Sequence, residues 1–489
     1  MFYSFSKLKE LFGFFLLIGV SSLLEAADGT WTLLAGGNAT GNWNTGANWS
    51  GGTIANGTDA IADFSTLNIT ATSTVTQNLA GLTLGTLNFS DAAVASNNWV
   101  LSGANSIALA TSAGTPTISV SNQTATISSV LTGSQGFTKT GAGTLTLSGA
   151  NTYDGKTIIS AGNVSINSLG NVGAASSALG APTTAAAGTI DLGTANLTYT
   201  GAATSSDRVI NVTGVTGIVF SSGSGTLTLT GGVTTTGGVS IAFFGTQNVV
   251  ESGLITGAIS VQRSNAGVLF LTNNNNNFSS VISSANGIID ISSIADSGVN
   301  SAAGAGNQIN LGQNSAGVVG SGTVRFSGAS GGSSNRTIRI TNGVTGGLGV
   351  LENSVAGQTL TLSGNITALS AVATTLTLQG VGDGNLSGVV SGFGAGSDFS
   401  LLKTGTGMWT LSGAASNTYT GTVQVTGGTL ALNKTAGLNA ITNTTVTVGS
   451  TATLKWNASN QIHDSAVMVL NGGTLNFNGN SETMGTLSA

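Results

Sequence analysis

The sequence contains no cysteine, two prolines, one histidine and only 6% charged residues among its 489. The absence of cysteine excludes a disulfide framework, a thiolate metal site and a cysteine nucleophile. With a single histidine, a zinc site built from histidine and cysteine side chains is also excluded. The net charge is −5, and the 12 basic residues are dispersed along the chain, so no basic patch exists for nucleic acid. We therefore expect no cofactor, no metal and no nucleic-acid partner.

Groups that could catalyse a reaction are also scarce. His463 is the only candidate base for a Ser-His-Asp arrangement, and we interpret it as a polar turn residue. The carboxylates are mostly isolated, and the closest pair that could share a face is Asp290 and Asp296. The glycine-rich strings lack the GxxxxGK[ST] pattern of a phosphate-binding loop. We predict no catalytic residue and no enzyme.

The residues that are present favour many short strands. The chain holds 75 glycines and 40% hydrophobic residues, with abundant threonine, valine, leucine and isoleucine. Branched apolar residues argue against disorder and fit pleated strands. Glycine and asparagine accept the positive φ angles of tight turns between such strands. The composition therefore predicts an all-β protein.

The first residues have the order of a secretory signal peptide. Lys7 and Lys9 precede an apolar run at 11–20, and small residues follow at Ala26 and Ala27. The apolar run is shorter than the roughly 20 residues that a membrane-spanning helix needs. We predict a signal peptide at 1–27, cleaved after Ala26 or Ala27, and therefore export.

Internal repeats follow the N-terminal region. Residues 127–166 and 386–432 share the pattern K-x-G-x-G followed by alternating apolar residues and a later tyrosine. A degenerate copy lies at 252–280, with Leu269, Leu271 and Phe278 in the roles of Leu145, Leu147 and Tyr153. Repetition of one unit is the sequence signature of a solenoid.

One repeat unit reads as short strands joined by turns. Leu145 and Leu147 alternate with threonines, the period of a strand with one buried face. Such short strands bury their apolar side only by stacking on neighbouring copies, in coils of about 20 to 25 residues. We expect glycine at a positive φ angle at Gly143 and Gly407. The predicted fold is a parallel β-helix.

Two features of the repeats allow more than one interpretation. The run Asn273–Asn277 could form a hydrogen-bonded ladder along the solenoid or a bulged loop. Tyr153 and Tyr419 could bind a ligand at matching turns, although packing against neighbouring coils is the favoured interpretation.

Four of the six tryptophans lie before the repeats, at Trp31, Trp43, Trp49 and Trp99. We interpret residues 28–103 as an N-terminal cap, because an open first coil pairs with other chains. The alternative is an exposed aromatic face that binds carbohydrate. Residues 104–489 are then the solenoid region.

The repeat units resemble the autotransporter-associated β-strand repeat, also called the passenger-associated transport repeat. The copy at 403 departs from the pattern, since Trp409 replaces the first leucine and two residues are inserted before Asn417. The residues that define the two clear copies are Lys139, Gly141, Gly143, Leu145, Leu147, Gly149, Asn151, Tyr153, Gly155, Lys403, Gly405, Gly407, Trp409, Leu411, Gly413, Asn417, Tyr419 and Gly421.

The resemblance implies a β-helical passenger region on the bacterial surface, associated with the outer membrane. It also implies a translocating barrel, which we expect outside this chain because no suitable run of amphipathic strands follows the repeats. We expect a non-catalytic scaffold or adhesin whose partners are host or matrix surface glycans or proteins. The alternative is a carbohydrate-binding or polysaccharide-active β-helix.

Overall fold

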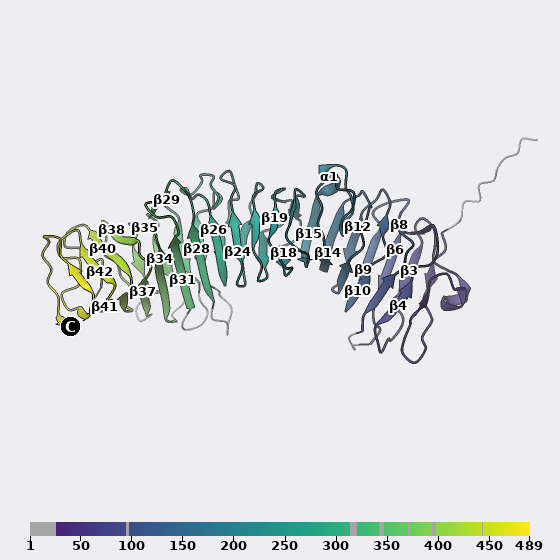
Figure 1. Ribbon diagram of the computed structural model, residues 1–489, viewed down its shortest axis with the longest axis horizontal. Helices are drawn as coiled ribbons and strands as arrows, with labels where there is room; N and C mark the ends of the chain where they lie inside the picture. The colour runs from purple at the N-terminus through teal and green to yellow at the C-terminus, as the bar shows by residue number, and fades with distance from the viewer. Residues whose placement is uncertain are drawn as a thin grey trace, which may run out of the picture.

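The chain forms an elongated rod of short strands stacked side by side along its length (Figure 1). The computed structural model describes residues 26–93, 97–312, 320–341, 347–369, 372–393, 398–442 and 444–489. The predicted signal peptide therefore lies outside the described residues, except for Ala26 and Ala27. About 16 turns of a parallel β-solenoid make up the rod, and helix contributes 2% of it. The predicted fold class is confirmed.

The largest sheet has 22 strands and covers two faces of the solenoid. Its two rows of strands are joined by β14 and β15, which run over the corner between the faces. One row consists of β1 (Gly29–Thr30), β3 (Ile61–Phe64), β6 (Thr86–Phe89), β9 (Thr117–Val120), β12 (Phe137–Thr140), β14 (Thr157–Ile166), β15 (Ile190–Tyr199), β17 (Ile210–Val212) and β20 (Val233–Thr235). The other consists of β2 (Gly41–Asn42), β4 (Ser73–Thr76), β7 (Trp99–Ser102), β10 (Thr124–Ile127), β13 (Thr144–Leu147), β14, β15, β18 (Thr216–Ser221), β21 (Ser240–Phe244), β23 (Ser260–Arg263), β25 (Ile282–Ser284), β27 (Gln308–Leu311), β30 (Thr337–Ile340), β33 (Ile366–Ala368) and β36 (Val390–Ser391).

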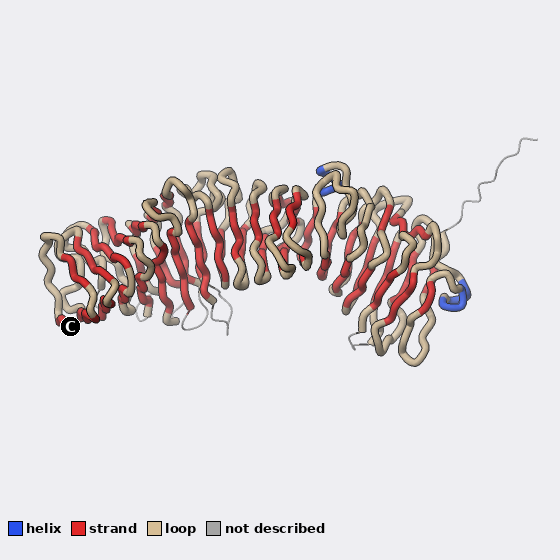
Figure 2. The backbone as a smooth tube through the Cα atoms, in the orientation of Figure 1, coloured by secondary structure: helices blue, strands red, loops and turns tan. Residues whose placement is uncertain are grey.

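Three further sheets complete the coils (Figure 2). A three-stranded sheet near the N-terminal end contains β5 (Leu82–Leu84), β8 (Ile107–Leu109) and β11 (Leu131–Thr132). A 13-stranded sheet contains β16 (Thr204–Ser206), β19 (Leu227–Leu229), β22 (Val249–Glu251), β24 (Val268–Leu271), β26 (Gly287–Ile291), β28 (Ser321–Phe326), β31 (Gly347–Asn353), β34 (Thr374–Gly380), β37 (Phe399–Lys403), β39 (Val423–Val425), β41 (Thr445–Gly449), β43 (Val467–Asn471) and β45 (Thr486–Ser488). A seven-stranded sheet contains β29 (Gly332–Ser334), β32 (Thr359–Leu362), β35 (Asp383–Leu386), β38 (Met408–Gly413), β40 (Gly428–Lys434), β42 (Ala452–Trp456) and β44 (Thr474–Asn476). The helical pieces are η1 (Gly46–Asn48), η2 (Ser50–Gly52) and α1 (Ala185–Gly188).

Coil length varies more than the repeats predict. Phe137 pairs with Thr157, 20 residues later, whereas Thr157 pairs with Ile190, 33 residues later. The longer coil carries the loop that contains α1. The expected range of about 20 to 25 residues is therefore too narrow, because loops between strands lengthen some coils without disturbing the register of the sheet.

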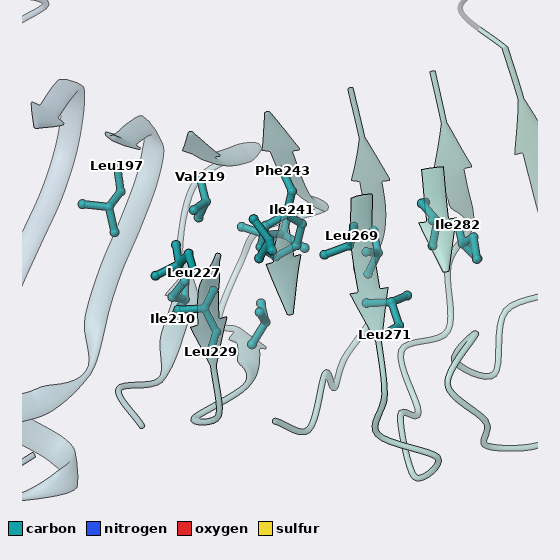
Figure 3. Close-up of a cluster of buried hydrophobic side chains, with 14 of the residues drawn as sticks. Leu197, Ile210, Val219, Leu227, Leu229, Ile241, Phe243, Leu269, Leu271 and Ile282 are labelled. Carbon is teal, nitrogen blue, oxygen red and sulfur yellow. The ribbon is translucent and has the colours of Figure 1, made fainter. Parts of the chain in front are cut away.

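The core is a continuous column of apolar side chains, to which each coil contributes several. Leu145 lies opposite Val164, which lies opposite Leu197 and then Val219, and all are buried. Figure 3 shows part of this column between Leu197 and Ile282. Each short strand therefore buries its apolar side against the coils before and after it, as the repeat pattern predicts.

The N-terminal tryptophans pack together inside the first coils. Trp31 and Trp43 each contact Trp49 at ring-centroid distances of 5.0 and 4.9 Å, and Phe64 packs beneath them. Trp31 and Trp43 are fully buried, and Trp49 and Trp99 are 2% exposed. The alternative of a carbohydrate-binding face made by these tryptophans is therefore wrong, because their rings have no surface to offer a ligand. The limits of the predicted cap, 28–103, stay a prediction.

Among the described residues, no helix has the length and apolar character that a membrane crossing requires.

We expect Trp43→Ala to destabilise the first coils by about 3–5 kcal/mol, because it empties a large buried volume next to the rings of Trp49 and Phe64. Urea unfolding followed by tryptophan fluorescence measures this change, since four of the six tryptophans report on the region. Leu34→Ala is the control, because Leu34 is 42% exposed in the same region and its loss changes stability by about 0.5 kcal/mol or less. An unchanged unfolding midpoint for Trp43→Ala would contradict the buried cap.

Candidate functional site

The described residues contain no group of three or more potential metal ligands. The ring of His463 accepts a hydrogen bond on Nδ1 from the backbone of Ser465, 3.2 Å away, which is a turn contact. Asp290 forms an ion pair with Arg325 at 3.7 Å and accepts from the hydroxyl of Ser327. Asp296 accepts from the backbone N–H of Asn335. These groups have structural partners, so the features that distinguish this chain lie in the repeats themselves.

The repeat lysine is a buried cation that closes a turn. Lys139 has no exposed surface and is the last residue but one of β12, just before the turn to β13. Its Nζ donates to the carbonyl oxygens of Thr140 at 2.7 Å, Gly141 at 2.8 Å and Ala161 at 3.3 Å. Two of these oxygens belong to its own turn and the third to the next coil. The lysine therefore fastens a turn and ties two coils together.

Buried cations also bind turn carbonyls in the other copies, and there Arg263 reaches the preceding coil where the lysines reach the next one. Lys403 donates to the carbonyl oxygens of Thr404, Gly405 and Gly427. In the degenerate copy, the guanidinium of Arg263 donates to four carbonyl oxygens, among them Gly245 at 2.7 Å and Gly267 at 2.9 Å. Sequence comparison missed this equivalence, although Arg263 stands four residues before a glycine, as Lys139 does before Gly143.

Burial lowers the pKa values of these cations. It lowers the pKa of Lys139 and of Lys403 to about 8, and it lowers the pKa of Arg263 to about 10. Carbonyl oxygens that accept from the charged form oppose this shift. At neutral pH the three groups therefore remain protonated and keep their full number of donors.

The two glycines after each repeat lysine have different roles. Gly141 and Gly405 adopt φ angles of 76° and 67°, in the left-handed region that favours glycine. Gly143 and Gly407 do not adopt positive φ, so the expectation for them is wrong. They are required for space, because a Cβ at Gly143 would lie 2.7 Å from two carbonyl oxygens, and one at Gly407 would lie 2.0 Å from the carbonyl oxygen of Gly382.

The repeat asparagines bridge three coils. Asn151 accepts from the backbone N–H of Leu131 in the preceding coil, at 2.8 Å, and donates to the carbonyl of Ala178 in the next, at 2.7 Å. Asn417 makes the same pair of bonds, to Val390 and Ala440.

Asn276 makes these bonds in the degenerate copy, with Ile255 and Ala302. One asparagine of the run at 273–277 is thus a buried bridge, and Asn274 and Asn275 form a turn before it. The partners of Asn276 are backbone groups, so it is not part of a ladder between asparagine side chains, and the turn at 274–275 fits the loop interpretation.

The aromatic residues of the repeats are buried. Tyr153 and Tyr419 have no exposed surface, and burial raises the pKa of Tyr153 to about 12 and that of Tyr419 further. The Tyr153 ring packs against Phe137 at 5.5 Å, and its hydroxyl bonds to that of Thr157. Phe278 is also fully buried. The ligand-binding interpretation is wrong, because these rings are enclosed between coils.

Trp409 is accommodated by a glycine in the preceding coil. It stands opposite Gly384, where a Cβ would lie 2.2 Å from the indole ring. Its Nε1 donates to the carbonyl of Gln379 at 3.2 Å. The departure from leucine at this position is therefore compensated by a smaller neighbour.

A second set of buried cations lies two coils after two of the three asparagine bridges, those of Asn151 and Asn276. Arg208 donates to the carbonyls of Leu179 and Gly188, both closer than 3 Å. Arg336 donates to the carbonyls of Ala295, Ala303 and Gly304. Sequence analysis missed both. The signal was present, since TSSDR at 204–208 and GSSNR at 332–336 have the same form.

Comparison with known proteins agrees with this repeat chemistry. The family described as Passenger-associated-transport-repeat matches residues 137–166 and 401–432, which contain the two lysine turns. The chain is similar to the protein named Adhesin BmaC autotransporter from Brucella suis biovar 1 (strain 1330), with 28% identity over 464 residues. That match covers 73% of this chain and 13% of the length of the relative. No solved structure matches the chain.

The fold and these matches define the class: a parallel β-solenoid built on transport repeats. The predicted resemblance is confirmed, because the chain carries passenger-associated transport repeats and is similar to an autotransporter adhesin.

We expect Lys139→Met to lower the local free energy of unfolding by about 2–3 kcal/mol, because three buried carbonyls lose a charged donor. Hydrogen exchange of residues 137–166, followed by mass spectrometry, measures the local change that a whole-rod melting curve would average out. The control is Lys156→Met in the same repeat, whose ammonium forms a half-exposed ion pair with Asp191 at 3.1 Å and contributes about 1 kcal/mol or less. Equal protection in both variants would show that the buried ammonium is dispensable.

A second prediction concerns Glu251, which is fully buried in β22 and has no hydrogen-bond partner for Oε2. Burial raises its pKa well above the ordinary value. Above about pH 4.5 the unfolded chain releases the proton of this carboxyl group, whereas the folded chain keeps it. The free energy of unfolding therefore falls as the pH rises above that value.

Glu251→Gln should remove that dependence. We expect the melting temperature of the variant to exceed that of the wild type by more at pH 8 than at pH 5. Asp398→Asn, at an exposed acid, is the control. A difference that stays constant between the two pH values would contradict a buried neutral carboxyl.

Proposed function

We propose that the chain is a non-catalytic, exported passenger that acts as a rigid surface scaffold and adhesin. The observation that carries the proposal is that half of the basic residues are buried and bind the backbone. Six of the 12 basic residues are buried, namely Lys139, Arg208, Arg263, Arg336, Lys403 and Lys434. Each donates to backbone carbonyl oxygens of the turns, so the polar chemistry of the repeats holds coils together.

The geometry suits a spacer that projects a surface away from a cell. About 16 turns at a rise of about 4.8 Å give a rod roughly 75 Å long. The named relative is an adhesin autotransporter. We extend the adhesive role to this chain as part of the proposal, with a location on the cell surface or outside the cell, in association with the outer membrane.

The pairing of Ala27 supports cleavage of the predicted signal peptide before it. Ala27 exchanges two backbone hydrogen bonds with Asn56, at 2.9 and 3.0 Å. Cleavage after Ala26 leaves this bridge to the first coils intact, whereas cleavage after Ala27 removes it. We therefore favour a mature chain that begins at Ala27.

The polysaccharide-active alternative has less support. The carboxylates considered for acid and base roles, Asp290 and Asp296, are engaged in an ion pair and a backbone bond. A carbohydrate-binding role for a surface away from these carboxylates is compatible with the proposal.

Adhesion can be tested with beads coated with the chain from Ala27 onward. We expect these beads to attach to epithelial monolayers or to immobilised matrix several-fold more than albumin-coated beads. Beads coated with chain that has been unfolded in urea and kept unfolded by carbamylation are the control for the solenoid. Attachment at the albumin level on every surface, or release of sugars from a polysaccharide panel, would contradict an adhesive, non-catalytic passenger.

A further inference from the structure

The outward surface of the second row of strands carries short polar side chains along most of the N-terminal half. β10 and β13 present Thr124, Thr126, Thr144 and Thr146 outward, and Asn163 and Ser165 of β14 continue the same two columns. The registers place these side chains opposite one another from coil to coil. This surface is therefore a regular array of hydroxyl and amide groups.

Val100 of β7 is a single apolar side chain in this array, whereas two adjacent coils further along carry a group of apolar side chains. Phe220 of β18 lies opposite Thr198 on one side and Phe244 of β21 on the other. The two rings contact each other with centroids 5.1 Å apart. Their chain neighbours Val219 and Phe243 belong to the buried core (Figure 3). Because side chains alternate across a strand, the two phenylalanines lie on the outer face, where both remain partly exposed.

Apolar residues extend this surface along both strands. Ile218 is partly exposed beside Phe220, and Val215 and Val239, at the turn before each strand, are 65% and 52% exposed. We call Val215, Ile218, Phe220, Val239 and Phe244 the phenylalanine patch. Exposed aromatic rings grouped on an otherwise polar outer face offer a small ligand an apolar platform.

Polar groups flank the patch on both sides. Asn196 and Thr198 stand opposite Ile218 and Phe220 in the preceding coil, and Gln262 follows in the next. Gln262 donates to Ser240 at 2.9 Å, so its carboxamide oxygen remains available to accept. None of the residues opposite the patch carries a charge, so the surface fits a neutral partner.

The size and the backbone of the patch argue against a protein partner. Two coils at about 4.8 Å and six residues at about 3.3 Å give a footprint of roughly 200 Å², whereas a stable protein interface covers about 800 Å² on each side. Strand addition is also blocked, because β18 and β21 are each paired on both edges, with β15 and β23 at the outer sides.

We propose that the phenylalanine patch binds a neutral glycan, with the apolar face of a sugar ring on Phe220 and Phe244 and its hydroxyls on the flanking amides and hydroxyls. The electron-rich face of an aromatic ring attracts the polarised C–H groups of a sugar ring. A footprint of about 200 Å² accommodates one or two sugar rings. The inference deepens the proposed adhesive function and rests on it.

The test uses the chain from Ala27 onward with a panel of neutral hexasaccharides, namely cellohexaose, chitohexaose, laminarihexaose and mannohexaose, measured by titration calorimetry. Heparin is the charged comparison. We expect millimolar or tighter binding to at least one neutral probe and none to heparin. Phe220→Ala with Phe244→Ala should weaken that binding by about tenfold or more, the loss expected for two stacking rings.

Two further variants separate ligand contact from fold. Phe220→Tyr with Phe244→Tyr keeps both rings and should bind within about threefold of the wild type, since the stacking faces are retained. Thr126→Ala with Thr146→Ala, on the same outer face but away from the patch, should bind as the wild type does. Circular dichroism melting verifies that each variant folds.

Three results would overturn the proposal: no binding to any neutral probe, binding that the alanine pair leaves unchanged, or self-association that the alanine pair abolishes in the absence of glycan binding. The last result would assign the patch to a second copy of the chain. Bead attachment distinguishes failure of the glycan-binding proposal from failure of the adhesive function. If beads coated with the alanine pair still attach, only the role of the phenylalanine patch is contradicted. If beads coated with the wild type do not attach, the adhesive function is contradicted.

Discussion

The structure depends on the satisfaction of inward-facing backbone carbonyls at the turns between its short strands. A solenoid of small coils turns often, and at each turn several carbonyl oxygens leave the sheet without a partner. A buried, unpaired carbonyl costs about 1–3 kcal/mol. A rod in which every coil bends several times between strands therefore tolerates few unpaired carbonyls. In this chain buried ammonium and guanidinium groups provide the missing donors, and one cation serves two to four carbonyls.

This arrangement differs from an ordinary buried ion pair. Lys139 and Arg263 are surrounded by carbonyl dipoles, and no carboxylate lies among their hydrogen-bond partners in the described residues. Several oriented dipoles offset the loss of hydration without a second charge that must also be buried. The asparagine bridges add a neutral version of the same device, since Asn151 joins a donor in one coil to an acceptor two coils away. Cations and amides together fix the register, which weak apolar stacking alone would leave free to slip.

The middle copy looks degenerate because its residues differ from those of the clear copies while the chemistry of the turn is the same. Arg263 replaces a lysine, Asn265 replaces a glycine and still adopts a positive φ of 71°, and Phe278 replaces a tyrosine. Each substitution keeps the property that the turn requires: a buried cation, a left-handed residue or a large buried ring. The family match includes only the two clear copies, whereas the hydrogen bonds show that the middle copy keeps the same contacts.

The sequence by itself determined the class of fold and the location of its two clear repeats. The alternation around Leu145 and Leu147, the repeated glycines and the Lys139 and Lys403 motifs are local signals, and local propensity is enough to specify a short strand and its turn. Only the tertiary structure decided which polar side chains are buried, because burial depends on the coils above and below. It showed that the tryptophans are enclosed, that Gly143 and Gly407 are needed for space, that Arg208 and Arg336 close turns far from any recognised repeat, and that Phe220 and Phe244 meet on an outer face. Apart from the tryptophan cluster, these contacts join residues more than 20 positions apart, and their spacing varies with loop length, so no fixed sequence interval could have revealed them.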